Sequence, residues 1–501
     1  MRIFESGKHV CQGESLPALA IAGLFFAVTS SLLPIASRIQ FGGDEGYELQ
    51  KALMMRRGFD IYGNFWNDQP PLHTAVLCGL FTMFGPSPMA PRLLSVACGS
   101  VVLFVACSLA AREFRNIAAI GTAMLLVSSK PFVELSVSAM LEMPCVALAS
   151  VSMWLAIGSA KPAFLGGILA GIPMGFALQT KLIAALYIPA VITAMILGSC
   201  GRLEQKRVDT KRCAWSIAGY LVGTLSAFLA VFAFFPDEFH YSLVHFRPSL
   251  AANFGPEYGF SYWEFVRQFP QIAVPLLGLL VVVRNRVFRS SSVWVPVAVQ
   301  AAVVLCAFTM HRPFWDYYFA HIYFPLSILG GIGCGVLFKE LSKSSWPGNG
   351  FQLSNPLVFS FGVMLTILTT IIPNRVIHEY RRLGMPEAIL DEEVIHRVQG
   401  KAHKTRWFFT FAPIYAFHSG LLTPPELTVV SKKRLMSGGF DSVVMTKILE
   451  KYRPEQMILY TSFSNDDAWE LFLNGYAMDF RDGGVAHYIR KDLASAHSIG
   501  P

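Results

Sequence analysis

Hydrophobic segments, many of them long enough to cross a bilayer, recur along the first three quarters of the chain. The apolar runs lie at residues 16–38, 71–85, 92–111, 117–129, 132–158, 163–177, 180–199, 214–235, 270–283, 293–310, 317–338 and 354–373. A straight helix needs roughly 20 apolar residues to cross the hydrocarbon core. The pattern therefore predicts a mainly α-helical, polytopic membrane domain over residues 1–373, followed by a polar tail.

One region breaks the regular alternation of apolar runs and polar loops. Between residues 71 and 142 the sequence contains three apolar runs, and the run 117–129 is too short for a straight membrane span. If residues 138–142 lie on the same side as the loop after the first run, one run must be short, tilted or re-entrant. The sequence does not show which one.

Basic residues predict which side each loop occupies. Lysine and arginine are concentrated in three loops, at residues 201–213, 284–289 and 339–343. Such loops are typically cytoplasmic. Alternation then puts the N-terminus in the cytoplasm and gives the other side the loops 39–70 and 236–269 and the tail 374–501. We expect a multi-pass protein of the inner (plasma) membrane whose tail is periplasmic or extracellular.

The tail has the pattern of a small α/β domain. Helices are predicted at residues 387–398 and 441–452, strands at 407–411 and 457–463, and a hairpin at 480–489. Asp441 or Ser442 is a suitable N-cap for the second helix, because both side chains can accept a hydrogen bond from a first-turn amide.

Composition agrees with a membrane protein and narrows its chemistry. Only 15% of residues are charged and 53% are hydrophobic, whereas soluble domains carry about 25% charged residues. The net charge of +8 follows from the basic loops, so we expect no nucleic-acid partner. Cysteines lie mostly in or beside apolar runs, without a CxxC motif, and no metal-ligand spacing is visible. We therefore expect no disulfide framework, no metal and no cofactor.

The segment GGDEGYELQKALMMRRG, residues 42–58, begins abruptly after the first apolar run. Asp44 and Glu45 are adjacent at its start, and a helix is predicted to end near Gly58. Asp44 suits an N-cap and Glu45 a favourable first-turn charge. A carboxylate at a helix start can equally act as a general base. Both interpretations of this pair stay open at this stage.

Other polar residues beside apolar runs are candidates for substrate binding. They are Asp68, Gln69, Glu142, Lys181, His311, Arg312, Tyr317, Tyr318 and His321. Each also has a structural alternative. Asp68 and Gln69 precede two prolines that suit a helix start, and Lys181 can extend to the membrane interface instead of binding phosphate. Glu142 favours function, because an acid within an apolar run is costly unless it is paired or solvated. Arg312 is a candidate phosphate anchor.

The order of these segments resembles a known enzyme group. GGDEGYELQKALMMRRG, NDQPPLHTAVLCGLFTMFGPSPMAPRLLSV, SVSAMLEMPCVAL and LQTKLIAALYIPAVI follow one another as in GT-C glycosyltransferases of the bacterial protein-mannosyltransferase, aminoarabinose-transferase and galacturonosyltransferase-like group. The resemblance covers residues 16–338, with a looser match at TRWFFTFAPIYAFHSG in the tail.

This resemblance implies a GT-C fold of about 11–13 transmembrane helices, with an outer domain above a cavity. It implies inverting transfer from a polyprenyl-phosphate sugar, with Asp44 as base and Glu45 supporting it. The acceptor would be lipid A or another glycolipid, a polysaccharide or a protein, and membrane lipids would surround the chain. Neither sugar nor acceptor is identified by the sequence.

One position departs from the pattern of the group. Relatives with aminoarabinose activity carry Glu-Lys before the two prolines, and this lysine contacts the phosphate. Here the pair is Asp68-Gln69, so the cation is absent. We expect another cation, such as Lys181 or Arg312, to carry the phosphate, or the donor to be held differently.

Two other classes of function compete with the transferase. The first is a transporter or flippase for lipid-linked sugars, which would keep ionisable groups near the bilayer midplane and often shows internal repeats. The second is a non-catalytic envelope assembly protein. The acids cluster at one membrane face and no repeat is visible, which favours the transferase.

Overall fold

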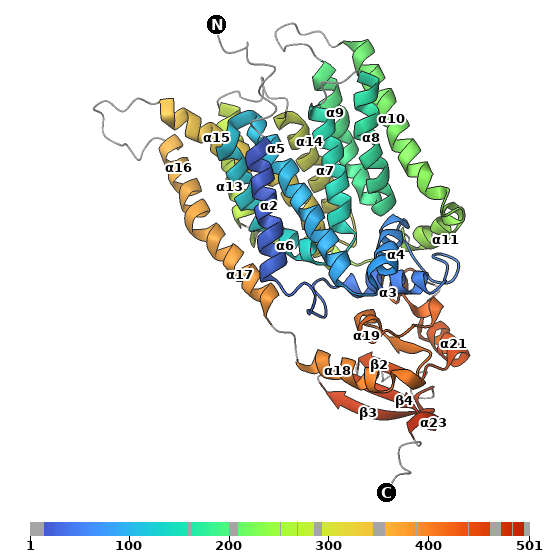
Figure 1. Ribbon diagram of the computed structural model, residues 1–501. Coiled ribbons are helices and arrows are strands. Elements are labelled where there is room, and N and C mark those ends of the chain that lie inside the picture. Colours follow the sequence, from blue (N-terminus) through green and yellow to red (C-terminus); the bar gives the residue numbers. More distant parts are fainter. Residues whose placement is uncertain are drawn as a thin grey trace.

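A computed structural model describes residues 15–158, 163–199, 209–250, 252–267, 269–284, 293–343, 356–385, 389–438, 440–460, 472–482 and 484–494. Figure 1 shows a bundle of long helices with a small domain of sheet and short helices at one end. The basic residues 201–208 and 285–289 lie outside the described residues, so the predicted side of these loops stays a prediction.

The helices of the bundle differ widely in length, from 6 residues in α12 to 39 in α5. They are α2 (Ser15–Leu32), α3 (Glu45–Arg56), α4 (Leu72–Phe84), α5 (Met89–Val127), α6 (Lys130–Val137), α7 (Glu142–Gly158), α8 (Ala163–Thr180), α9 (Ile188–Ser199), α10 (Thr210–Phe232), α11 (Glu238–Leu250), α12 (Tyr262–Arg267), α13 (Phe269–Arg284), α14 (Trp294–Met310), α15 (Phe319–Lys343), α16 (Pro356–Thr366) and α17 (Ile372–Gly384).

The apolar helices support the predicted membrane architecture. Within the described residues, six helices are long and apolar enough to cross a membrane, and two bent pairs raise this number to eight. Three shorter apolar helices, α2, α4 and α14, accompany them. The mainly α-helical polytopic fold is confirmed, with six to eight candidate spans among the described residues where 11–13 transmembrane helices were predicted.

The predicted runs 92–111 and 117–129 form an antiparallel hairpin within α5. Helical geometry breaks at Phe114 (φ −140°, ψ 32°) and Arg115 (φ 53°, ψ −145°). Across this turn, the thiol of Cys107, before the break, donates a hydrogen bond over 3.4 Å to the carbonyl of Ala119, after it. A continuous helix would hold residues twelve apart at about 18 Å, so the chain reverses direction at the turn.

The helix α4 resolves the ambiguous region between residues 71 and 142, because both of its ends lie at the same end of the bundle. Near its start, the His73 ring nitrogen is 3.2 Å from the carbonyl of Ala139. Shortly after its end, Arg92 donates to Glu45, which also accepts from the amide of Ala139. The chain returns to Ala139 within eight residues of the end of α4, and Phe81 in the last turn of α4 stacks on Phe417 of the C-terminal domain with ring centroids 5.4 Å apart. The helix therefore stays at this end of the bundle, and the run 71–85 is the one that does not span.

A sharp bend brings the start of α7 beside the segment that begins GGDE. The helices α6 and α7 meet at 107°, with residues 138–141 between them. Gly42 packs against this turn so closely that a Cβ atom there would lie 2.5 Å from the Met140 sulfur. A Cβ atom there would displace the Met140 and Ser138 side chains, so the glycine allows the close approach that brings Glu142 near Asp44.

The C-terminal domain is built on a four-stranded sheet of order β1-β2-β4-β3. Its strands are β1 (Phe408–Thr410), β2 (Gln456–Tyr460), β3 (Tyr476–Asp482) and β4 (Val485–Arg490), and its main helices are α18 (Ile389–Gly400), α19 (Pro413–His418), α20 (Lys432–Met436) and α21 (Ser442–Tyr452). Strands β1 and β2 are parallel, and the other pairs are antiparallel. Asp441 caps α21 by accepting from the amide of Val444 over 2.8 Å, as predicted.

The C-terminal domain is docked on α3 (Figure 1). A Cβ atom on Gly46 would lie 2.7 Å from the backbone nitrogen of Ile414 in α19. The Tyr47 hydroxyl donates to the carbonyl of Val430 over 3.0 Å, and the Gln50 amide donates to the carbonyl of Leu421. These contacts fix residues 429–433 beside the first residues of α3.

Candidate active site

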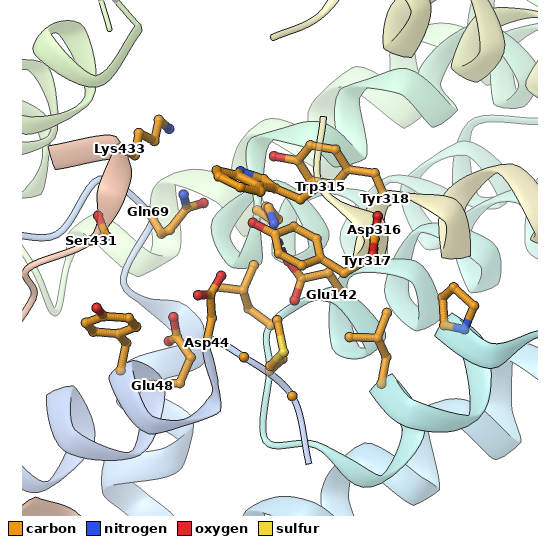
Figure 2. Close-up of a pocket in the computed structure, with 18 of the residues that line it drawn as sticks. Asp44, Glu48, Gln69, Glu142, Trp315, Asp316, Tyr317, Tyr318, Ser431 and Lys433 are labelled. Carbon is orange, nitrogen blue, oxygen red and sulfur yellow. Dashed lines mark hydrogen bonds and ion pairs between the residues drawn. The ribbon is translucent and has the colours of Figure 1, made fainter. Parts of the chain in front are cut away.

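A cavity of about 670 Å³ opens where the loops of the bundle meet the C-terminal domain (Figure 2). Its lining combines segments that are far apart in the chain: Gly42, Gly43, Asp44, Tyr47, Glu48, Lys51, Trp66, Asn67, Asp68, Gln69, Lys130, Pro131, Glu134, Leu135, Met140, Leu141, Glu142, Lys181, Glu264, Phe314, Trp315, Asp316, Tyr317, Tyr318, Phe319, Val429, Ser431, Lys432 and Lys433. Seven carboxylates, five lysines and several aromatic rings therefore face one space.

Asp44 lies at the position of an N-cap but does not act as one. It precedes α3 with φ −97° and ψ 0°, and its side chain makes no capping hydrogen bond. Figure 2 shows its carboxylate directed into the cavity. Burial, with a further contribution from the Glu142 carboxylate, raises the pKa of Asp44 to about 6. Such a carboxylate is mostly ionised at neutral pH and is a stronger base than an ordinary one, which suits proton transfer.

Glu45 lies outside the cavity lining, in a fully buried ion pair with Arg92. Both partners have 0% side-chain exposure. The two Arg92–Glu45 hydrogen bonds are each 2.9 Å, and the carboxylate also accepts from the backbone amides of Phe41 and Ala139 at 2.8 Å. With its oxygens occupied in this way, Glu45 fixes the first residues of α3 relative to α5 and to the turn before α7.

Glu142 and Lys181 form a second buried pair, and this one faces the cavity. The Lys181 ammonium donates to the Glu142 carboxylate. It also lies 4.7 Å from the ring centre of Tyr317 and 5.0 Å from that of Tyr318. The structure thus brings these four sequence-based candidates together on one wall of the cavity. Their rings and charges stabilise each other where an isolated charge would be costly.

Asp68 and Gln69 lie on another wall, where they meet the C-terminal domain. The Lys433 ammonium of α20 donates to Asp68 over 2.7 Å. The backbone carbonyl of Gln69 accepts hydrogen bonds from Tyr62 and Asn67, each at 2.6 Å, while its side chain lines the cavity. The cavity thus receives a cation beside Gln69, although from a part of the chain that sequence reasoning did not consider.

The remaining candidates do not line the cavity. His311 and Arg312 are exposed. His321 is fully buried, with one ring nitrogen 3.4 Å from the Tyr187 hydroxyl. Their assignment to substrate binding stays a prediction without support from the geometry. Among the described residues, no group of three histidine, cysteine or acidic side chains has the arrangement of a metal site.

Several lining residues were missed by sequence reasoning. Trp315 and Asp316 lie in the segment HRPFWDYYFAH, residues 311–321, in which the candidates were His311, Arg312, Tyr317, Tyr318 and His321. Lys432 and Lys433 belong to a polar tail without any motif. The two lysines reach the cavity because α3 contacts residues 413–430, and no local sequence pattern predicts contacts between segments so far apart.

Comparisons with known proteins bear on the fold and on part of the bundle. Residues 68–234 match the family model described as dolichyl-phosphate-mannose-protein mannosyltransferase. No curated protein sequence matches the chain significantly. The solved structure of ArnT from Cupriavidus metallidurans in the apo state is similar at a TM-score of 0.61 and 15% identity, covering 94% of this chain and 97% of that chain. The same protein bound to undecaprenyl phosphate gives a TM-score of 0.59 at 15% identity, with the same coverage.

A third similar structure is the archaeal oligosaccharyltransferase AglB from Archaeoglobus fulgidus, in complex with an inhibitory peptide and a dolichol-phosphate. It has a TM-score of 0.55 and 12% identity, covering 94% of this chain and 74% of that chain. The sequence-based prediction of the fold is thereby confirmed. The chain has the GT-C fold, and its structural similarity to ArnT extends over the bundle and the C-terminal domain together.

Proposed function

We propose that this protein is an integral-membrane glycosyltransferase that moves a sugar from a polyprenyl-phosphate donor to an acceptor in the cell envelope. The observation that carries the proposal is the carboxylate of Asp44, which is half-buried at the cavity and makes no capping hydrogen bond. The matched family model is named for a transferase with a dolichyl-phosphate donor. ArnT with undecaprenyl phosphate and AglB with a dolichol-phosphate are relatives in fold that bind such lipids.

In the proposed reaction, an acceptor hydroxyl attacks the anomeric carbon of the donor sugar from the face opposite the lipid phosphate. The new carbon–oxygen bond forms as the bond to phosphate breaks, so the configuration inverts. Asp44 accepts the proton of the hydroxyl, and the lipid phosphate departs with the bonding electrons. Lysines at the cavity stabilise the charge that develops on the leaving phosphate, which is electrostatic catalysis by preorganised groups.

The size and lining of the cavity suit a sugar substrate. Pockets for small ligands usually measure about 300–1,000 Å³, and the cavity of about 670 Å³ lies within this range. Trp66, Trp315 and Tyr317 offer aromatic faces, and acidic side chains can accept hydrogen bonds from sugar hydroxyls. We propose that the acceptor is a glycolipid such as lipid A, a polysaccharide or a protein. We also propose that the protein lies in the inner membrane with its cavity on the outer side.

Mass spectrometry of envelope glycolipids and glycoproteins tests this function even though the sugar is unidentified. Cells that lack the protein should lose one sugar mass from one envelope component, and the wild-type chain should restore it. The Asp44→Asn variant should insert at a normal level but restore none of the sugar. Asp441→Asn is the matched control, because Asn also caps helices well. Restoration of the sugar by Asp44→Asn would show that Asp44 is not the base.

A further inference from the structure

The cavity offers five lysines for a donor phosphate, and they differ in how far they are already engaged. Lys51 and Lys181 are buried in ion pairs with Glu48 and Glu142. Lys130, Lys432 and Lys433 are more accessible. Among the described residues, Lys433 is the one of these three that forms an ion pair with Asp68, next to Gln69, where the sequence lacks the lysine of related enzymes.

From this placement we propose that Lys433, supplied by the C-terminal domain, is the residue that binds the donor phosphate in place of the missing lysine at position 69. The proposal rests on the proposed function for the class of donor. It assigns a part of the binding site to the extramembrane domain.

The local geometry leaves Lys433 able to accept an anionic ligand. An ammonium group has three donors, and one hydrogen bond, to Asp68, is recorded for Lys433 in the part of the chain that the structure describes. Its side chain is 24% exposed and that of Asp68 is 11% exposed. The pair is therefore neither a freely solvated surface bridge nor a closed buried one. Two donors stay available to a phosphate oxygen while the contact with Asp68 holds the ammonium in place.

The segment that carries Lys433 is fixed on both sides. Before it, the carbonyl of Val430 accepts the hydroxyl of Tyr47 in α3. After it, Arg434 donates to the carbonyls of Glu426 and Val429 at 2.6 and 2.8 Å. Because the backbone at Lys433 is already held in place, binding a ligand orders less of the chain there. The entropic cost of binding is therefore lower than for a lysine on a mobile loop. Figure 2 shows Lys433, Ser431 and Gln69 along one side of the pocket view.

Binding of farnesyl phosphate and of farnesol, its uncharged counterpart, tests the proposal with the full-length protein in detergent micelles. Wild type should bind farnesyl phosphate more tightly than farnesol. In Lys433→Gln, the Kd for farnesyl phosphate should rise about tenfold or more, because a charge-assisted hydrogen bond is lost, while the Kd for farnesol should not change. Lys451→Gln is the matched control, since Lys451 pairs with Glu426 on the surface of the same domain, outside the cavity.

A second variant separates phosphate binding from a purely structural bridge between Asp68 and α20. Lys433→Gln combined with Gln69→Lys returns a cation to the cavity without restoring the link to α20. Recovery of farnesyl phosphate affinity in the double variant supports the proposal. No recovery, or an equal loss of affinity for farnesol in Lys433→Gln, would mean that the lysine only holds the domain, and the proposal would be wrong. If wild type binds farnesyl phosphate no more tightly than farnesol, the proposed polyprenyl-phosphate donor is wrong, whatever the role of Lys433.

Discussion

Replacing Glu45 by glutamine should destabilise the protein severely while leaving the shape of the side chain almost unchanged. In the wild type, the Glu45 carboxylate receives two hydrogen bonds from Arg92 and two from backbone amides, at 0% exposure. The glutamine side chain would present an amide nitrogen to one of these donors, and the negative charge would be gone. Arg92 would then be a buried cation without a counter-ion, and breaking one partner of a buried pair costs about 3–5 kcal/mol.

The measurement is reversible unfolding in mixed detergent micelles, followed by tryptophan fluorescence, for wild type and Glu45→Gln. Glu393→Gln provides the matched control, because Glu393 pairs with Arg397 in an exposed i,i+4 arrangement, with 41% and 38% exposure. Exposed pairs contribute about 0–1 kcal/mol, so the control should unfold almost like wild type.

The outcome also distinguishes two roles for Glu45. The sequence-based hypothesis makes Glu45 part of the catalytic pair, whereas the geometry favours a structural role. If Glu45→Gln unfolds within about 1 kcal/mol of wild type but no longer transfers sugar, the structural reasoning is wrong and Glu45 takes part in the reaction. A large loss of stability, with transfer per folded molecule largely retained, would support the buried-pair argument.

Three further predictions follow from single contacts. Transfer should rise as the pH increases through about 6 and then level off, because the raised pKa of Asp44 keeps the base protonated below that value; a rate that stays constant across this range would argue against this base. Asp441→Ala should lower the free energy of unfolding by about 1 kcal/mol, since the amide of Val444 loses its cap, as chemical denaturation of the full chain would show. Gly46→Ala should destabilise the protein by about 1–3 kcal/mol through overpacking, because its methyl group would lie 2.7 Å from the Ile414 backbone nitrogen; thermal unfolding in micelles checks this value.

Much of the fold was predictable because apolar helices and capped helix ends leave strong local patterns in the sequence. The apolar runs indicated the bundle, and residues 441–452 indicated α21 with its Asp441 cap. The position of α4 was not predictable, because a run of apolar residues looks the same whether it crosses the bundle or lies at one end of it. Only long-range contacts distinguish these cases, those of His73 at its start and of Phe81 in its last turn, together with the return of the chain at Arg92.

The candidate site was predictable only in part, for a related reason. Asp44, Glu142 and Lys181 stand out in the sequence because charges beside apolar runs are costly. Glu45 is equally conspicuous, but whether a carboxylate faces a cavity or an arginine depends on side-chain direction around α3. Lys433 is inconspicuous, because one lysine among many in a polar tail has no local signature. Long-range docking alone brings it to Asp68.

The participation of residues 429–433 in the cavity wall has a consequence for the biogenesis of the protein. These residues are synthesised after every helix of the bundle. A nascent chain with all its membrane helices in place still lacks one wall of its cavity. The complete pocket forms only after the C-terminal domain has folded against α3, and until then the cavity lacks Lys433 and Ser431.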